Sequence, residues 1–318
     1  MKDSPSMQIS IHTVPASKGL NWVTQSLDVA GRRPGLVLSA MLLGLFVLVV
    51  LAFAAAIPGA VMMGLDSADH ALGLSFSTVW VLVVPPMLVM IFAQPVVFAG
   101  LLHVLREVDA GRPVGVTGIL AGLAGGRTMA LASIGLVQVA SSALNLLFTR
   151  LFGGAEYLPQ YGNYMASMTK GVVIAPPVPE HGALLFVSGL ALGFLAFTAQ
   201  MYAIAQVQFQ RREPLAAVIA SLRASIVNVL PLTVAGLIFA VGLFVGIIVL
   251  MLAGGLLVMI VSFVAKALGS LIALLIGLFA TALVLTLMFG GIYLSWRDMF
   301  SDEQPPADEP EQRIQAEM

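Results

Sequence analysis

Charged residues are scarce in this chain, and cysteine is absent. Only 10% of the 318 residues are charged and 59% are hydrophobic, whereas soluble globular domains have about 25% charged and about 45–50% apolar residues. One soluble core cannot hide so much apolar surface, but a bilayer accepts it on the outside of each helix. The sequence therefore predicts an all-α, polytopic transmembrane helix bundle. The lack of cysteine excludes disulfides, thiolate metal sites and cysteine nucleophiles.

The short motifs that usually carry chemistry are missing too. There is no phosphate-binding G-x-x-x-x-G-K-[ST], no zinc-binding H-E-x-x-H and no G-x-S-x-G nucleophile elbow. The four histidines are scattered over termini, loops and span ends: His12, His70, His103 and His181. A net charge of -1 creates no field that attracts nucleic acid. We therefore expect no enzymatic activity, no metal, no cofactor and no nucleic-acid partner.

Acidic residues are also missing from the interior of the apolar runs, where no Asp or Glu occurs. Ion-coupled carriers usually keep an ionisable group there, although a charge at the bilayer centre costs about 2.5–3.5 kcal/mol or more. This absence argues against a coupled transporter.

What the sequence does contain is a series of apolar runs long enough to cross the roughly 30 Å hydrocarbon layer. Within a transmembrane domain of residues 34–300, we expect spans near residues 36–57, 76–102, 128–150, 183–206, 227–252 and 269–295. Most basic residues fall in the two termini and in the second and fourth loops: Lys2, Lys18, Arg32, Arg33, Arg106, Arg112, Arg127, Arg211, Arg212, Arg223, Arg297 and Arg313. The opposite side holds Arg150, Lys170 and Lys266. Because cytoplasmic segments are enriched in Lys and Arg, both termini are expected in the cytoplasm.

The two terminal segments, residues 1–33 and 301–318, differ in character. Residues 17–33 predict an amphipathic helix with four apolar residues on one face: Leu20, Val23, Leu27 and Ala30. This helix is expected either to lie on the anionic inner leaflet or to pack as a cap on the other helices. The C-terminal segment is acidic, contains proline and lacks aromatic residues, so we expect a disordered cytoplasmic tail.

Two inner loops are similar in plan, because each carries basic residues and then a proline, Pro113 or Pro214, before an apolar stripe. The stripes are Val116, Ile119, Leu120 and Leu123 in the first loop, and Leu215, Val218, Ile219 and Leu222 in the second. Such stripes predict amphipathic helices on the inner leaflet, where anionic lipids attract the basic residues. The similarity also suggests a three-plus-three repeat.

Residues 253–268 are apolar but too short to form a separate span. We expect a re-entrant or interfacial half-helix that breaks at Gly254–Gly255. Lys266 is the one charged residue between residues 226 and 295. Since a central lysine costs about 2.5–3.5 kcal/mol, it is expected at the outer interface, at the turn between the last two spans.

Five side-chain amides lie inside the predicted spans: Gln94, Gln138, Asn145, Gln200 and Asn228. Amides that bridge membrane helices contribute about 0.6–2 kcal/mol each, so packing contacts are preferred over a substrate site at Gln94 and Gln200. The patterns Gly189–Gly193 and Gly242–Gly246 predict close helix packing, with homodimerisation as the alternative.

Several short motifs are distributed over most of the chain. They are Val14-Pro15-Ala16 with Gly19-Leu20 and Trp22, Arg33-Pro34, Pro95 and Gly100 before Gly111-Arg112-Pro113, and Tyr293 with Trp296-Arg297-Asp298-Met299-Phe300. Together they resemble an uncharacterised proteobacterial family of six-helix inner-membrane proteins. The sequence departs from that family at Trp296, where Tyr is expected, and in a long loop over residues 152–181. The resemblance implies a bacterial inner membrane and no known activity.

The leading functional hypothesis is a non-enzymatic inner-membrane protein that supports or organises envelope components, with the bilayer and other membrane proteins as partners. The alternative is a permease or channel for a small solute, which requires a water-accessible polar cavity near Gln94 and Gln200. An intramembrane enzyme ranks third, because no nucleophile–base pair or metal set is visible. The chemistry of the cavities in the bundle distinguishes the first two.

Overall fold

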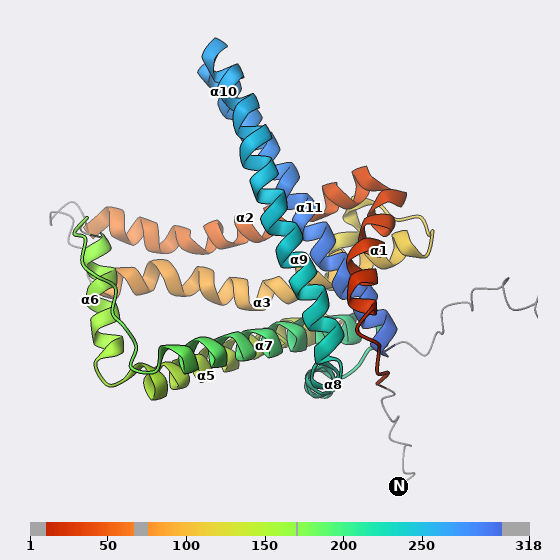
Figure 1. Cartoon of the computed structure of the whole chain (residues 1–318), viewed down its shortest axis with the longest axis horizontal. Helices are drawn as coiled ribbons and strands as arrows, with labels where there is room; N and C mark the ends of the chain where they lie inside the picture. The colour runs from red at the N-terminus through yellow and green to blue at the C-terminus, as the bar shows by residue number, and fades with distance from the viewer. Residues whose placement is uncertain (1–10, 67–75, 170, 301–318) are drawn as a thin grey trace, which may run out of the picture.

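The computed structural model describes residues 11–66, 76–169 and 171–300, and every regular element in these residues is a helix. Four long helices run in roughly the same direction: α2 (Pro34–Asp66), α3 (Phe76–Asp109), α5 (Leu136–Gly153) and α7 (Gly182–Gln210) (Figure 1). α2 packs beside α3, and α5 packs beside α7. Two further helices, α9 (Val229–Val249) and α11 (Lys266–Phe300), cross that direction steeply. The shorter elements are α1 (Lys18–Arg32), η1 (Val116–Leu123), α4 (Thr128–Ser133), α6 (Tyr157–Thr169), α8 (Pro214–Val227), η2 (Leu250–Gly254) and α10 (Gly255–Val264).

Within the described residues, six helical segments are long and apolar enough to cross a membrane: Pro34–Val61, Val83–Asp109, Thr128–Gly153, Gly182–Gln210, Val229–Phe263 and Lys266–Phe300. The predicted all-α bundle with six candidate spans is therefore confirmed. The tail predicted to be disordered, residues 301–318, lies outside the described residues.

The last two spans form a long hairpin. α9 continues through η2, a single π-helical turn, into α10, so the half-helix expected at residues 253–268 is wrong. In lipid every backbone N–H needs a hydrogen-bond partner within the protein. The π-helical turn keeps the helix continuous, whereas in water a glycine pair would favour a break. The chain reverses at the extended residue Ala265, and the exposed Lys266 begins α11. The 35 residues of α11 form a rod about 52 Å long, and a span that exceeds the hydrocarbon thickness is accommodated by tilt.

Buried residues gather at one end of the bundle, which we call the core end. It contains the first half of α2, the C-terminal halves of α3, α7 and α11, and the helices α1 and α8. Beyond the core end the helices expose large apolar side chains, such as Phe53, Phe186 and Phe263, which are 72%, 71% and 95% exposed. This distribution fits helices whose outer surfaces face hydrocarbon.

Helix α1 packs on α9 and α11, as the cap hypothesis requires. The face that packs is Gly19, Trp22, Ser26 and Val29, whereas Leu20 and Leu27 of the predicted face are about half exposed. Small residues decide the orientation: Gly19 lies against the backbone of Pro231, and Ser26 lies against Gly290. Close backbone contact at small residues is the usual packing mode of membrane helices.

Both loop helices expose only part of their predicted apolar stripes, because Ile119 of the first stripe is buried and Val218 of the second packs against the core. Leu120 and Leu123 of η1 are 51% and 58% exposed, and Leu215 and Ile219 of α8 are 73% and 58% exposed. The buried face of α8 consists of small residues: Ala217, Ala220, Ser221, Ala224 and Ser225. The first loop also forms a 3-10 helix instead of the predicted amphipathic α-helix. These differences leave the three-plus-three repeat a hypothesis.

Candidate functional site

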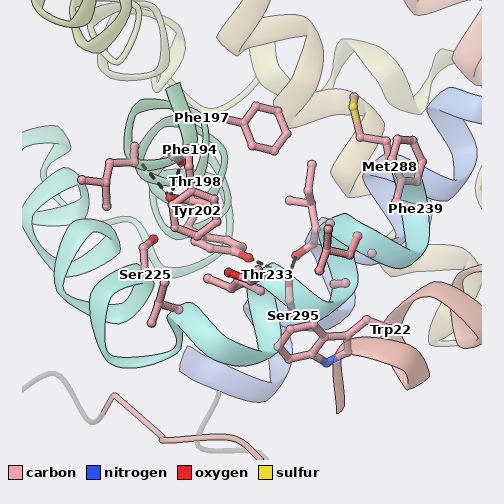
Figure 2. A pocket seen from close by; sticks show the side chains of 18 of the residues that line it. Trp22, Phe194, Phe197, Thr198, Tyr202, Ser225, Thr233, Phe239, Met288 and Ser295 are labelled. Atoms are coloured by element: carbon pink, nitrogen blue, oxygen red, sulfur yellow. Dashed lines mark hydrogen bonds between the residues drawn. The ribbon is translucent and has the colours of Figure 1, made fainter. Parts of the chain in front are cut away.

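A cavity of about 810 Å³ lies between α7, α9 and α11, with Trp22 of α1 and Ser225 of α8 also lining it (Figure 2). We call it the cleft. It exists because α8 packs back on α7 while α9 packs on α1, which keeps α7 and α9 apart. Volumes of about 300–1,000 Å³ are typical of ligand pockets.

The walls of the cleft are apolar, and no charged residue is among its lining residues. Representative wall residues are Leu190 and Phe194 of α7, Phe239 of α9, and Leu287 and Met288 of α11. An ion or a strongly polar solute would lose its hydration there without gaining partners, at a cost of several kcal/mol. The walls therefore suit hydrocarbon.

Polar groups collect at one end of the cleft, which we call the hydroxyl end: Thr198, Tyr202, Ser225, Thr233 and Ser295. Figure 2 shows Ser225, Ser295 and Trp22 toward one side of the pocket and Phe197, Phe239 and Met288 toward the other. Tyr202 and Ser295 form a hydrogen bond of 2.9 Å between their oxygens, which joins α7 to α11. Four of the five hydroxyl side chains are nearly fully buried and Thr233 is exposed, so the cleft presents little polar surface.

Behind the hydroxyl end, two carboxylates bind three helices together. Trp22 lines the cleft and donates its Nε1–H to Oδ2 of Asp298 at 3.0 Å, and Lys18 Nζ lies 3.3 Å from the same oxygen. Asp109 at the end of α3 accepts from Tyr293 at 3.0 Å and from Arg297 at 2.7 Å, both on α11. We call Asp109 and Asp298 with these partners the carboxylate cluster.

Arg32 joins the same cluster from α1, with its Nη1 atom 3.2 Å from Oδ1 of Asp109. Both carboxylates are only 13% exposed. Charge-assisted hydrogen bonds in such partly buried places are stronger than neutral ones. The carboxylate cluster therefore fixes α1 against α3 and α11, and with it the position of Trp22.

A second set of polar contacts fixes α8 and the N-terminal segment. Asn228, which precedes α9, accepts from the backbone N–H of Val14 at 2.8 Å and donates to the carbonyl of His12 at 3.1 Å. Gln206 of α7 donates to Ser221 of α8 at 2.8 Å. These buried amides hold the elements around the cleft and do not line it.

The five amides predicted to lie in spans have different surroundings. Gln200 and Asn228 are buried, Gln94 is partly buried, and Gln138 and Asn145 are exposed on α5. None of the five lines the cleft. Lys266 stands at the tip of the long hairpin, far along α11 from Ser295. Among the residues that the structure describes, no group of three or more His, Asp or Glu could hold a metal ion.

Sequence reasoning missed the residues that build the site. Asp109 and Asp298 looked like ordinary span-edge acids, and the span hydroxyls Thr198 and Ser295 were not singled out. A usable signal was present in the resemblance motifs, because Trp22, Tyr293, Arg297 and Asp298 occur in them and meet in the structure.

Comparisons of the chain with family models, curated proteins and solved structures return no match. The resemblance to a proteobacterial family therefore remains an expectation. The composition and the six long apolar helices of the described residues establish the chain as a multi-pass helical membrane protein.

Proposed function

We propose that this protein is a non-enzymatic component of a bacterial inner membrane that supports or organises the envelope by holding the hydrocarbon chain of a membrane amphiphile in the cleft. The observation that carries the proposal is the large apolar cavity between α7, α9 and α11. Its partners are the bilayer, a lipid-like ligand and other membrane proteins.

The dimensions of the cleft fit a chain from one leaflet. Its lining extends along α7 from Val187 to Tyr202, which corresponds to about 22 Å of helix at 1.5 Å per residue. One leaflet contributes roughly half of the 30 Å hydrocarbon layer, or about 15 Å. A single acyl or isoprenoid chain therefore has enough wall to lie along.

The alternative permease requires a polar cavity near Gln94 and Gln200, and the cleft is lined by neither residue. Gln200 is instead buried, at 7% exposure, in the packed core end. The geometry therefore favours a ligand-holding role over solute passage.

Replacing Gly236 with leucine is expected to block the cleft. Gly236 lines the cleft, and an added Cβ there meets no atom within 4 Å, so the position has room for a side chain. The amount of lipid retained after purification in mild detergent, measured by native mass spectrometry, should fall several-fold. The apparent melting temperature without added lipid should stay near that of the unmodified chain.

Gly242→Leu is the matched control, because Gly242 lies on the same helix, also has open space at its Cβ, and does not line the cleft. It should retain lipid like the unmodified chain. Equal retention by the Gly236 and Gly242 variants would refute the cleft as the binding site.

Lys266 tests the proposed orientation, with both termini in the cytoplasm and the hairpin tip outside. Because the chain has no cysteine, a Lys266→Cys variant carries a single thiol at the exposed tip. A membrane-impermeant thiol reagent should label it in intact spheroplasts. The control Ala110→Cys, in the exposed loop after α3, should react only after the membrane is disrupted. The reverse pattern would overturn the orientation.

A further inference from the structure

We infer that the outward face of α8 is a docking surface for anionic phospholipid at the core end of the bundle. Only Ser225 and Ile226 of α8 line the cleft, so this surface is separate from the proposed ligand site and either can fail without the other. Three features of α8 carry the inference: its direction, the side chains that it exposes, and the arginines beside them.

Helix α8 lies crosswise to the long helices. Figure 1 shows α8 almost end-on, whereas α5 and α7 run across the picture. Because α7 is long and apolar enough to cross the membrane, a helix that lies crosswise to it is parallel to the membrane surface. Residues 211–213 join α8 directly to the end of α7, which places α8 where a span meets the head groups. In the orientation proposed above, this is the inner leaflet.

The two faces of α8 differ in the size of their side chains. The face that packs against α7 consists of alanine and serine. The outward face has large apolar residues at positions i, i+4, i+7 and i+11: Leu215, Ile219, Leu222 and Ile226. Leu222 is partly exposed, and the other three are exposed by more than half of their surface. A helix of this kind lies in the interface with its apolar face at the boundary between head groups and acyl chains.

The apolar face of α8 continues into the beginning of α9. Val227, Val229 and Leu230 follow Ile226, and all three are about half exposed or more. Because α9 begins a segment that is long and apolar enough to cross the membrane, the outward face of α8 is continuous with a surface that faces hydrocarbon. Lipid is therefore the occupant that covers both.

Helix α1 lies at the same end of the bundle and has an outward face of a different character. Its exposed residues include Asn21, Gln25 and Asp28, although Leu20 and Leu27 are also about half exposed. A mostly polar face of this kind suits water. The contrast shows that an exposed apolar stripe is a property of α8 and not of every short helix at the core end.

Basic residues lie at both ends of the stripe. Arg211 is exposed at the left-handed turn that ends α7, and Arg223 is exposed in the last part of α8. Neither arginine forms an ion pair with an acidic residue of the described chain. Glu213 is the one acid between residues 211 and 228. Anionic lipids attract basic residues beside an apolar face, and a guanidinium group matches a phosphate in shape and charge.

Crosslinking in nanodiscs tests the selectivity for anionic lipid. The purified full chain is embedded with two photoactivatable lipids of identical tails, a phosphatidylglycerol and a phosphatidylcholine, and crosslinks are mapped by mass spectrometry. At about 0.1 M salt, phosphatidylglycerol should label the α8 peptide about five-fold more, the ratio that roughly 1 kcal/mol for a basic residue at an anionic surface gives. At about 1 M salt, where the Debye length falls to about 3 Å, this preference should largely disappear.

The double substitution Arg211→Gln with Arg223→Gln should remove the preference at low salt. Arg150→Gln is the matched control, because Arg150 is an exposed arginine of α5 at the end of the spans away from the core end. It should keep the five-fold preference that one basic residue predicts at about 1 kcal/mol. Equal labelling by the two lipids in the unmodified chain would overturn the inference, and so would an equal loss of preference in the two variants.

A second measurement separates lipid from a protein partner as the occupant. Because the chain has no cysteine, Ile219→Cys and Gln25→Cys each carry a single spin label, the first on α8 and the second on α1. In nanodiscs, the label at position 219 should be more accessible to oxygen, which dissolves in hydrocarbon, and the label at position 25 to a water-soluble nickel chelate. Equal access of the chelate to both labels would show that the outward face of α8 is open to water, which would overturn lipid as its occupant.

Discussion

Replacement of Asp109 with alanine is expected to destabilise the protein by about 2–3 kcal/mol, somewhat less than the 3–5 kcal/mol typical of breaking a fully buried pair. The carboxylate is 13% exposed and has partners on α1 and α11: Arg32, Tyr293 and Arg297. Without it, Arg32 loses its counter-charge and Tyr293 loses its acceptor, while Arg297 keeps a longer contact of 3.9 Å with Asp298. Since Arg32 and Arg297 are partly solvated, at 52% and 34% exposure, water reduces the loss.

Thermal unfolding of the full chain in mild detergent measures this effect. Trp22 and Trp296 both lie in the core end, so their fluorescence reports the relevant region. Asp28→Ala is the matched control, because Asp28 is an exposed acid on α1, and such substitutions usually stay within about 0.5 kcal/mol. Equal melting temperatures for the two variants would show that the carboxylate cluster does not hold the bundle together.

Gly100→Ala is expected to cost a similar amount, about 2–3 kcal/mol, through overpacking. A Cβ at Gly100 would overlap the backbone of Ile119, where η1 crosses α3. Because the obstacle is backbone, no change of rotamer relieves it, and η1 would have to move away from α3. The yield of monodisperse protein and its melting temperature should both fall.

Gly242→Ala provides the comparison, since an added methyl there meets no atom within 4 Å. Exchange of glycine for alanine inside a helix is otherwise favourable by up to about 1 kcal/mol. The Gly242 variant should therefore be as stable as the unmodified chain or slightly more stable. A Gly100 variant that behaves the same way would mean that η1 does not pack as the structure shows.

The spans could be predicted because the thickness of the bilayer imposes a minimum length on each apolar run, and Lys266 could be placed at a turn because a central lysine is costly. The continuous helix through Gly254–Gly255 could not be predicted. Glycine is a break signal in water, where solvent satisfies the freed backbone groups, and hydrocarbon offers no such partner. The packed face of α1 could not be predicted either. Gly19 and Ser26 are only weakly hydrophobic, but their small size lets α1 come close to the backbones of α9 and α11.

The cleft could not be predicted from the sequence, because it depends on which helices pack against one another. Amides such as Gln94 and Gln200 drew attention as polar groups in apolar runs, yet the residues around the cavity are mostly ordinary apolar residues. Only the placement of α8 against α7 and of α9 against α1 separates the walls. Likewise, nothing local to Asp109 indicates that Arg32 and Arg297 converge on it.

The bond between Trp22 and Asp298 joins residues 276 positions apart, and this separation determines when the cleft can form. During synthesis α1 emerges first, whereas its docking surfaces on α9 and α11 emerge last. Until then the apolar face that carries Trp22 and Val29 has no partner, and closing such a long loop is slow. A ribosome-bound chain can thus insert its early spans without possessing a binding site, and the site becomes available only after α11 has been made.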